Sequence, residues 1–206
     1  MSKEETHPTK FWSSPEAAIW WTREDNRYEI SGLNRESEEF IQITVARLKP
    51  ESVLEVGAGT GRLIGKLGEE FPWIDAHSAD VNALLREIVS QRHPGVITHE
   101  IVSGRLPFSD ALFDLAYTYQ VLQHVPPEEI KNLFSEMRRV SKAVLLIEGY
   151  VPGKHDGERT HPANGGSYFH EYEKFAGAGG FSHVERGELS SGKIRWFLFH
   201  RGELTS

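Results

Sequence analysis

The sequence predicts a single α/β domain built on a mostly parallel β-sheet. Three observations lead to this prediction: a length of 206 residues, short apolar segments rich in β-branched side chains, and amphipathic helical segments that alternate with them. A chain of this length buries enough surface to need neither disulfides nor a structural metal ion. We therefore expect one domain over residues 1–206.

The predicted helices and strands alternate between residues 36 and 148. Periodic apolar residues mark the helices, Pro50 and Pro72 end two of them, and Asn82 and Pro127 begin two others. The expected order is helix 36–48, strand 52–56, helix 63–71, strand 74–79, a helix that buries Leu84, Leu85, Ile88 and Val89, strand 96–102, strand 113–119, helix 127–140 and strand 143–148.

The end of the chain departs from this alternation. Residues 151–167 contain proline, glycine, asparagine and histidine, which predicts a long loop, and a helix is expected near residues 168–176. Two strand-like segments, 182–189 and 193–200, are joined by a short link and predict an antiparallel hairpin.

The charge and composition exclude several classes of protein. With 23 Lys and Arg against 30 Asp and Glu, the net charge of −7 argues against non-specific binding to nucleic acid. The absence of cysteine excludes a disulfide framework, cysteine zinc sites and a thiol nucleophile. No apolar segment approaches the roughly 20 residues of a membrane helix, and residues 1–10 are polar. We expect a cytoplasmic protein without a membrane partner.

A glycine-rich segment between the first strand and the following helix carries the strongest functional signal. Gly57, Gly59 and Gly61 allow a tight turn and a close approach of a ligand to the backbone, and Asp80 ends the next strand, where a carboxylate can accept both hydroxyls of a ribose. The spacing G-x-G-x-G differs from the G-x-G-x-x-G of dinucleotide sites, which disfavours a nicotinamide oxidoreductase. Glu55 could meet a cationic group through water or backbone. A tight turn without a ligand is the competing interpretation.

Residues 52–148 resemble a class I S-adenosylmethionine-dependent methyltransferase of the small-molecule type. Glu55-Val-Gly-Ala-Gly-Thr-Gly61 matches the first motif of that family, Asp80 matches its ribose-binding acid, and residues 106–115 with 121–126 resemble the segment around its fourth strand. The resemblance implies a Rossmann-like three-layer sandwich, with a seven-stranded, mostly parallel sheet and an antiparallel last strand. It also implies S-adenosylmethionine as the cofactor.

The resemblance carries family roles onto particular positions of this chain. The cofactor-binding residues that it implies are Glu55, Gly57, Ala58, Gly59, Gly61, Asp80, Val81, Ser103, Gly104, Thr118, Tyr119 and Gln120. The chain departs from the family at Val102, where many relatives have an aspartate that receives the adenine amino group. Adenine recognition then depends on backbone groups or on a displaced acid such as Glu100.

Two histidines are candidates for a catalytic base, because the unperturbed pKa of histidine is nearest to neutrality. His124 follows the fourth strand at the ligand-binding edge, although it could simply cap the next helix. His170, beside Glu171, lies in the segment that can fold over the substrate, although an ordinary helix start explains it equally well. The spacing of His155, Asp156, His161 and His170 matches no compact ligand set, so no metal site is expected.

The N-terminal residues 1–35 form an arm rich in aromatic side chains, namely Phe11, Trp12, Trp20, Trp21 and Tyr28. This density indicates either a lid that closes over cofactor and acceptor or a helix that packs on the sheet. The segment 151–172 is expected to face the substrate.

The leading functional hypothesis is transfer of a methyl group from S-adenosylmethionine to an oxygen or nitrogen of a small molecule by in-line displacement. Carbon methylation stays open. Methylation of amino groups on nucleobases or on glutamine is disfavoured, because the Asn/Asp-Pro-Pro-Tyr/Phe motif of those enzymes is absent. The alternative is a catalytically silent S-adenosylmethionine-binding subunit that regulates a partner. Monomer and homodimer are both compatible with the sequence.

Overall fold

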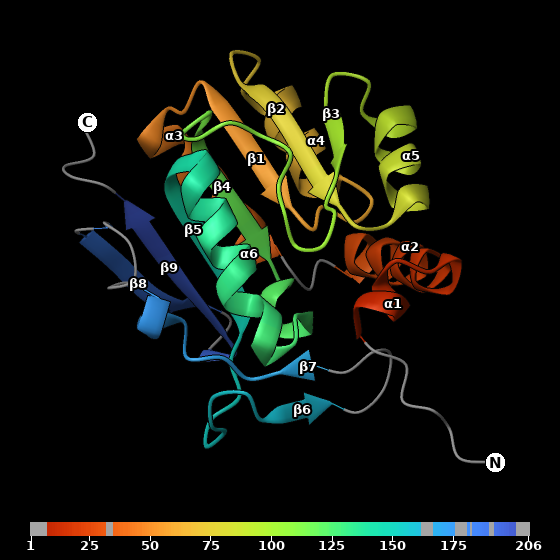
Figure 1. Cartoon of the computed structure of the whole chain (residues 1–206). Coiled ribbons are helices and arrows are strands. Elements are labelled where there is room, and N and C mark those ends of the chain that lie inside the picture. Colours follow the sequence, from red (N-terminus) through yellow and green to blue (C-terminus); the bar gives the residue numbers. More distant parts are fainter. Residues whose placement is uncertain are drawn as a thin grey trace.

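The computed structural model describes residues 8–31, 35–161, 167–175, 181, 183–189 and 192–200. Its centre is a seven-stranded sheet with the order β3-β2-β1-β4-β5-β9-β8 (Figure 1). The strands are β1 (Ser52–Val56), β2 (Asp75–Asp80), β3 (Ile97–Glu100), β4 (Phe113–Tyr119), β5 (Ser141–Gly149), β8 (His183–Leu189) and β9 (Ile194–His200). Neighbours from β3 to β5 are parallel, and β9 runs antiparallel to both β5 and β8. The predicted sheet, with its antiparallel last strand, is confirmed.

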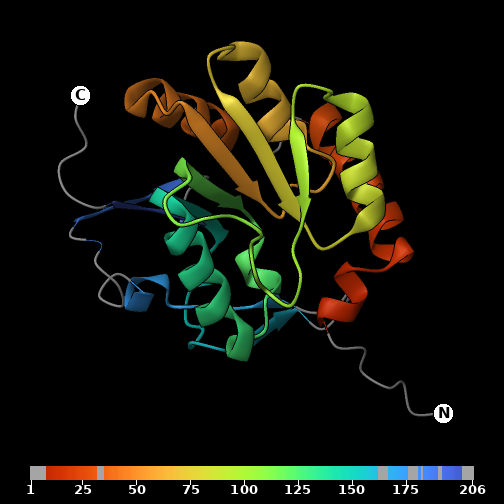
Figure 2. The ribbon, with the colours of Figure 1, turned by 45° about the horizontal axis from the view of Figure 1, so that its top comes forward.

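Helices cover both faces of the sheet, which gives the predicted three layers (Figure 2). One core contains apolar side chains of α3 (Arg35–Leu48), α4 (Arg62–Glu70) and α5 (Ala83–Arg92), and the other contains those of α6 (Pro127–Val140). The central strands β1, β4 and β5 are almost wholly buried, as expected of a parallel sheet covered on both faces. Within the described ranges, no helix is both long and apolar enough to cross a membrane.

The helix α5 begins at the predicted cap but buries fewer residues than predicted. The Asn82 side chain accepts hydrogen bonds from the backbone N–H groups of Leu84 and Leu85. Leu85 and Val89, four residues apart, face the sheet, whereas Leu84 is 43% exposed. The prediction that Leu84 is buried is wrong because successive helical side chains point about 100° apart, so Leu84 cannot share the face of Leu85.

The segment after β5 contradicts the helix predicted near residues 168–176. It forms two short antiparallel strands, β6 (Arg159–His161) and β7 (Ser167–Tyr168), followed by the short 3-10 helix η2 (Tyr172–Phe175). The backbone of Phe169 bonds to that of Gly157 and Glu158, at 2.7 and 2.8 Å, and so cannot make helical bonds. Residues 162–166 and 176–180 lie outside the described part of the chain, as does the predicted link at 190–191.

The N-terminal helices α1 (Pro8–Trp12) and α2 (Pro15–Ser31) lie beside α5, near the carboxyl ends of β1 and β2 (Figures 1 and 2). Ala17 and Ala18 of α2 are buried. The Nδ2 atom of Asn82 donates hydrogen bonds to the backbone oxygens of Trp12, at 2.9 Å, and Ser14, at 2.8 Å. The arm is therefore attached to the residue that caps α5.

Candidate functional site

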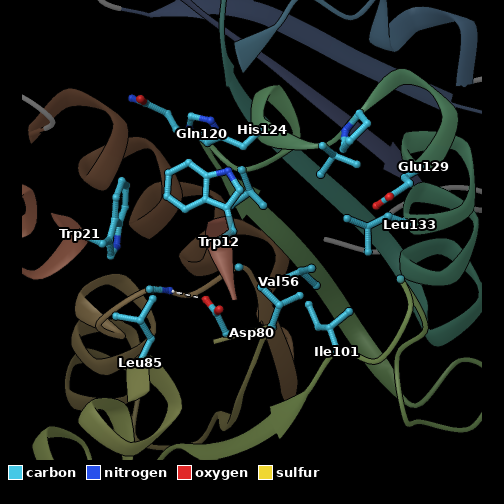
Figure 3. A pocket seen from close by; sticks show the side chains of 17 residues that line it. Trp12, Trp21, Val56, Asp80, Leu85, Ile101, Gln120, His124, Glu129 and Leu133 are labelled. Atoms are coloured by element: carbon cyan, nitrogen blue, oxygen red, sulfur yellow. Dashed lines mark hydrogen bonds between the residues drawn. The ribbon is translucent and has the colours of Figure 1, made fainter. Parts of the chain in front are cut away.

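A cavity of about 920 Å³, its open mouth included, lies at the carboxyl ends of β1, β2 and β4 (Figure 3). The strand order reverses between β1 and β4, and the crevice at such a switch point is where open α/β sheets bind ligands. The cavity is lined by Trp12, Trp21, Val56, Gly57, Gly59, Asp80, Val81, Leu85, Ile101, Gly104, Gln120, Val121, His124, Val125, Pro126, Glu129 and Leu133. Most of these are apolar, and the ionisable ones are Asp80, His124 and Glu129.

The glycine-rich turn brings backbone to the cavity. Gly57 and Gly59 have φ angles of 75° and 57°, in the left-handed region that favours glycine, and both line the cavity. The backbone N–H of Gly57 donates to Ala79 O at 2.7 Å, which fixes the turn against β2. Gly61 faces Val89 instead and precedes the first residue of α4. Of the predicted residues in this turn, Ala58 and Gly61 are not part of the cavity wall.

Asp80 is buried at the end of β2 and borders the cavity. Its Oδ2 accepts a hydrogen bond from Gly59 N at 3.0 Å, and its Oδ1 accepts one from Asn82 N at 2.8 Å. Burial raises the pKa of Asp80 to about 6, although these two bonds and Arg86 favour the ionised form. Each carboxylate oxygen keeps a second lone pair, so Asp80 can still accept hydrogen bonds from two hydroxyls of a ligand.

Glu55 does not line the cavity, contrary to its predicted place among the cofactor-binding residues. Its Oε2 accepts a hydrogen bond from the backbone N–H of Ile64, at 3.1 Å, in the first turn of α4. Burial, and then the neighbouring Glu55 charge, raises the pKa of the Tyr117 hydroxyl well above its usual value. Glu55 therefore stabilises the start of α4, because carboxylates are favourable at helix N-termini.

Three cofactor-binding residues are predicted at the end of β4, namely Thr118, Tyr119 and Gln120. Of these, only Gln120 lines the cavity. The backbone of Gln120 has a φ of 54°, and its side chain lines the cavity. Thr118 is buried and donates its hydroxyl to Glu148, at 2.7 Å, whereas the Tyr119 ring packs in the core beneath α3 and α4. Alternation along the strand sends these two side chains into the opposite layers.

The turn after β3 lines the cavity through Ile101 and Gly104. Backbone hydrogen bonds join Val102 and Arg105, and Ser103 and Gly104 between them have φ angles of 51° and 69°. Ser103 is not part of the cavity wall. The side chain of Glu100 is 60% exposed and pairs with Arg86 at 3.5 Å, outside the cavity. Glu100 is therefore not placed to serve as the displaced acid, and the alternative of recognition by backbone groups stays a prediction.

His124 lines the cavity from the 3-10 helix η1 (Leu122–His124). Its ring lies 4.5 Å from that of Trp12, measured between centroids, and its Nδ1 is 3.3 Å from the Ser167 hydroxyl. His124 therefore lines the cavity with its ring in contact with two distant parts of the chain, Trp12 and Ser167.

His170 is 3% exposed and does not reach the cavity. Its Nε2 lies 3.0 Å from Val125 O, and its ring packs between those of Tyr168 and Tyr172. Burial lowers its pKa, so the neutral ring donates to the carbonyl at neutral pH. The second predicted catalytic residue therefore holds the loop behind the cavity.

Glu148, at the end of β5, holds the loop that carries Gln120 and His124, a role that the sequence did not suggest. The carboxylate is fully buried and accepts hydrogen bonds from the Thr118 hydroxyl and from the backbone N–H groups of Val121, at 3.3 Å, and Gln123, at 3.4 Å. Burial raises its pKa to about 7. The available signal was an acidic residue ending the apolar segment Ala143 to Ile147.

Two tryptophans of the N-terminal arm complete the wall of the cavity. Trp12 lies against His124, and Trp21 lies against the glycine turn (Figure 3). Trp20 contacts both indoles, with centroid distances of 5.9 Å to Trp12 and 5.6 Å to Trp21. The arm therefore packs on the domain and covers the cavity at the same time, so the two predicted interpretations are compatible.

The contact between Trp21 and Gly59 can be tested by adding a single methyl group. A Cβ at Gly59 would overlap the indole nitrogen of Trp21 and lie 2.6 Å from its Cδ1. We expect Gly59→Ala to lower the free energy of unfolding by about 1–3 kcal/mol through overpacking and left-handed strain. Introducing Gly59→Ala into a Trp21→Ala protein should cost less, because only the backbone strain then remains. Equal losses in the two backgrounds, measured by chemical denaturation, would contradict the contact.

In the part of the chain that the structure describes, no group of three or more His, Asp or Glu side chains is arranged to hold a metal ion. His77 and His99 do lie close together, with 2.9 Å between His77 Nδ1 and His99 Nε2. Asp75 Oδ2 is 3.1 Å from His77 Nε2. These residues lie outside the cavity wall.

An open parallel sheet with a glycine-rich turn after β1 and a buried acid after β2 defines a nucleoside-cofactor-binding α/β domain. Residues 53–143 match the family model described as a methyltransferase domain. Residues 53–143 therefore form an S-adenosylmethionine-dependent methyltransferase domain, whose cofactor is S-adenosylmethionine. No curated protein sequence matches the chain.

Solved structures support the same fold. A TehB-like methyltransferase from Corynebacterium glutamicum superposes with a TM-score of 0.67 at 14% identity, covering 92% of this chain and 100% of that one. A putative O-methyltransferase from Nostoc punctiforme gives 0.65 at 15% identity, covering 84% of this chain and only 58% of its own length. Magnesium protoporphyrin IX methyltransferase from Synechocystis, with bound S-adenosylhomocysteine, gives 0.60 at 14%, covering 81% and 82%. Identities this low show the fold alone.

Proposed function

We propose that the protein transfers a methyl group from S-adenosylmethionine to an oxygen or nitrogen of a small-molecule acceptor. The observation that carries this proposal is the position of His124 beside Trp12, on the wall of a cavity that also holds the glycine turn and Asp80. The net charge of −7 favours a small acceptor over a nucleic acid.

The residues of the cavity fit the cofactor. The glycine turn leaves backbone unobstructed where a Cβ would fill space, and Asp80 keeps two acceptor lone pairs for the ribose hydroxyls. Gly57, Gly59 and Gln120 then border the methionine portion, and Val81 borders the ribose. When bound, the cofactor supplies an electrophilic methyl group on a sulfonium.

The remaining task of the protein is to align the acceptor, exclude water and move one proton. Trp12 and Trp21 cover the cavity, which removes water from the reacting groups. His124 faces the same space and accepts the proton of the attacking hydroxyl or amine, with its ring held by Trp12 and Ser167. Alignment in line with the breaking bond supplies most of the rate.

Two neighbours support a small-molecule acceptor by analogy of fold. One is the magnesium protoporphyrin IX methyltransferase mentioned above. The other, from Haemonchus contortus, is described as a phosphoethanolamine N-methyltransferase in complex with phosphomonomethylethanolamine. The two acceptors differ widely in size and charge, so they support methyl transfer to small molecules without choosing between oxygen and nitrogen.

Release of S-adenosylhomocysteine from S-adenosylmethionine, measured over a panel of small hydroxyl and amine acceptors, tests the proposal. With a turned-over acceptor, His124→Asn should lower kcat by about 100-fold, the size of a general-base contribution, and change the KM for S-adenosylmethionine by less than about threefold. The exposed His155→Asn is the matched control. An unchanged kcat would exclude His124 as the base. Tight S-adenosylhomocysteine binding without any turnover would favour the silent regulatory subunit.

A further inference from the structure

The cavity contains two carboxylates, and they lie on different elements. Asp80 lies at the glycine turn, whereas Glu129 lies in the first turn of α6, beside Leu133 (Figure 3). Asp80 is bonded to the backbone of Gly59 and Asn82, so its position is fixed at that end. At the end of the cavity opposite Asp80, Glu129 is the one acidic side chain among the described residues of the wall.

The wall between these two carboxylates is apolar. Ile101 and Leu133 lie along the wall between Asp80 and Glu129 (Figure 3), and Gly104 also lines the cavity. An apolar wall with a polar group at its end suits a planar heterocycle that carries one hydrogen-bonding substituent. The nearby Val102 and Glu100 do not line this space, since their side chains are mostly exposed.

We propose that Glu129 accepts a hydrogen bond from the exocyclic amino group of the cofactor's adenine and so selects adenine over other purines. The inference depends on the proposed position of the ribose at Asp80, because the base then extends between Ile101 and Leu133. An amino group is a pure donor, and a carboxylate is a pure acceptor, so the pair is complementary. The oxo group of hypoxanthine is an acceptor at the same place and is repelled by the carboxylate.

A helix-dipole effect alone is the competing explanation for an acid at this position. Acidic side chains stabilise the first turn of a helix without touching any ligand, and α6 has two of them, Glu128 and Glu129. Glu128 is exposed and outside the cavity wall, whereas Glu129 is partly buried in it. The pair therefore offers a matched control: both residues share the dipole effect, and only Glu129 faces the cavity.

Calorimetric titration with three ligands tests the inference. The ligands are S-adenosylhomocysteine, its analogue with unsubstituted purine, which lacks only the amino group, and its analogue with hypoxanthine, which has an oxo group in that place. Glu129→Ala should weaken S-adenosylhomocysteine binding about tenfold, the value of one hydrogen bond to a charged group, and change the affinity for the purine analogue less than about twofold. Glu128→Ala should leave both affinities unchanged. Glu129→Gln should bind the hypoxanthine analogue better than the wild type does.

The outcomes separate this inference from the proposed function. Equal weakening of both ligands by Glu129→Ala, or no weakening of either, would overturn the role of Glu129 while leaving the cofactor site intact. Failure of the wild-type protein to bind S-adenosylhomocysteine would instead overturn the site itself. Thermal unfolding of each variant, with and without ligand, reports whether a lost affinity reflects a lost fold.

Discussion

Asp80→Ala should weaken the binding of S-adenosylhomocysteine by at least tenfold. In the proposed cofactor complex, the substitution removes two charge-assisted hydrogen bonds to the ribose, each worth about 1.5–3 kcal/mol. Asp80→Asn keeps the size of the side chain and one acceptor oxygen, so its loss of affinity should be smaller. Wild-type affinity should also fall as the pH is lowered through about 6, because burial raises the pKa of Asp80 to about 6 and its protonated form accepts fewer hydrogen bonds.

Calorimetric titration at several pH values measures both effects. Asp75→Ala is the control, because Asp75 lies on the same strand with its side chain 66% exposed. Because an amide can accept only one of the two backbone bonds from Gly59 and Asn82, thermal unfolding of Asp80→Asn without ligand separates a change in fold from a loss of ribose contacts. An unchanged affinity in both Asp80 variants would place the ribose elsewhere.

Glu148→Gln should alter the pH dependence of stability by about 3 kcal/mol. The folded-state pKa of Glu148 is about 7 against a usual value of 4.5, so between these values the folded protein binds more protons than the unfolded chain. Stability contributed by this group is therefore present below about pH 4.5 and is lost as the pH rises through about 7. The glutamine variant cannot titrate and lacks this loss.

Urea denaturation of both proteins between about pH 4 and about pH 8 measures the difference in the free energy of unfolding. The wild type should lose stability relative to Glu148→Gln as the pH rises, whereas the exposed Glu188→Gln should show a constant difference from the wild type. Parallel curves for the wild type and Glu148→Gln would contradict the elevated pKa. In Glu148→Gln, loss of one acceptor oxygen for the backbone N–H groups of Val121 and Gln123 would appear as a constant offset from the wild type.

Local patterns in the sequence were sufficient to predict the sheet. The central strands β1, β4 and β5 are short, largely apolar segments, and Asn82 caps α5 as predicted. The helix predicted near residues 168–176 was wrong for a physical reason. The backbone of Phe169 bonds to Gly157 and Glu158, which lie outside the segment from which the helix was predicted. The hydrogen bonds that attach the arm could not be predicted from local patterns either, because Asn82 and Trp12 lie far apart in the sequence.

The predicted site residues that line the cavity are mainly those whose position follows from the course of the backbone. Gly57, Gly59 and Asp80 line the cavity because a turn and a strand end must lie at this edge of the sheet. The match to the family motif could not show that Glu55 bonds to the first turn of α4 or that Thr118 bonds to Glu148. Both contacts depend on the face of the sheet to which a strand side chain points. Glu129 was missed because a helical acid near an N-terminus has a sufficient local explanation.

Asn82 connects the N-terminal arm to Asp80 through hydrogen bonds. Its backbone N–H donates to Asp80, its Oδ1 accepts from α5, and its Nδ2 donates to the arm at Trp12 and Ser14. Ligand binding at Asp80 and docking of the arm are therefore linked equilibria, and any coupling between them must be reciprocal. Whatever factor the docked arm adds to cofactor affinity, bound cofactor adds to the docking of the arm.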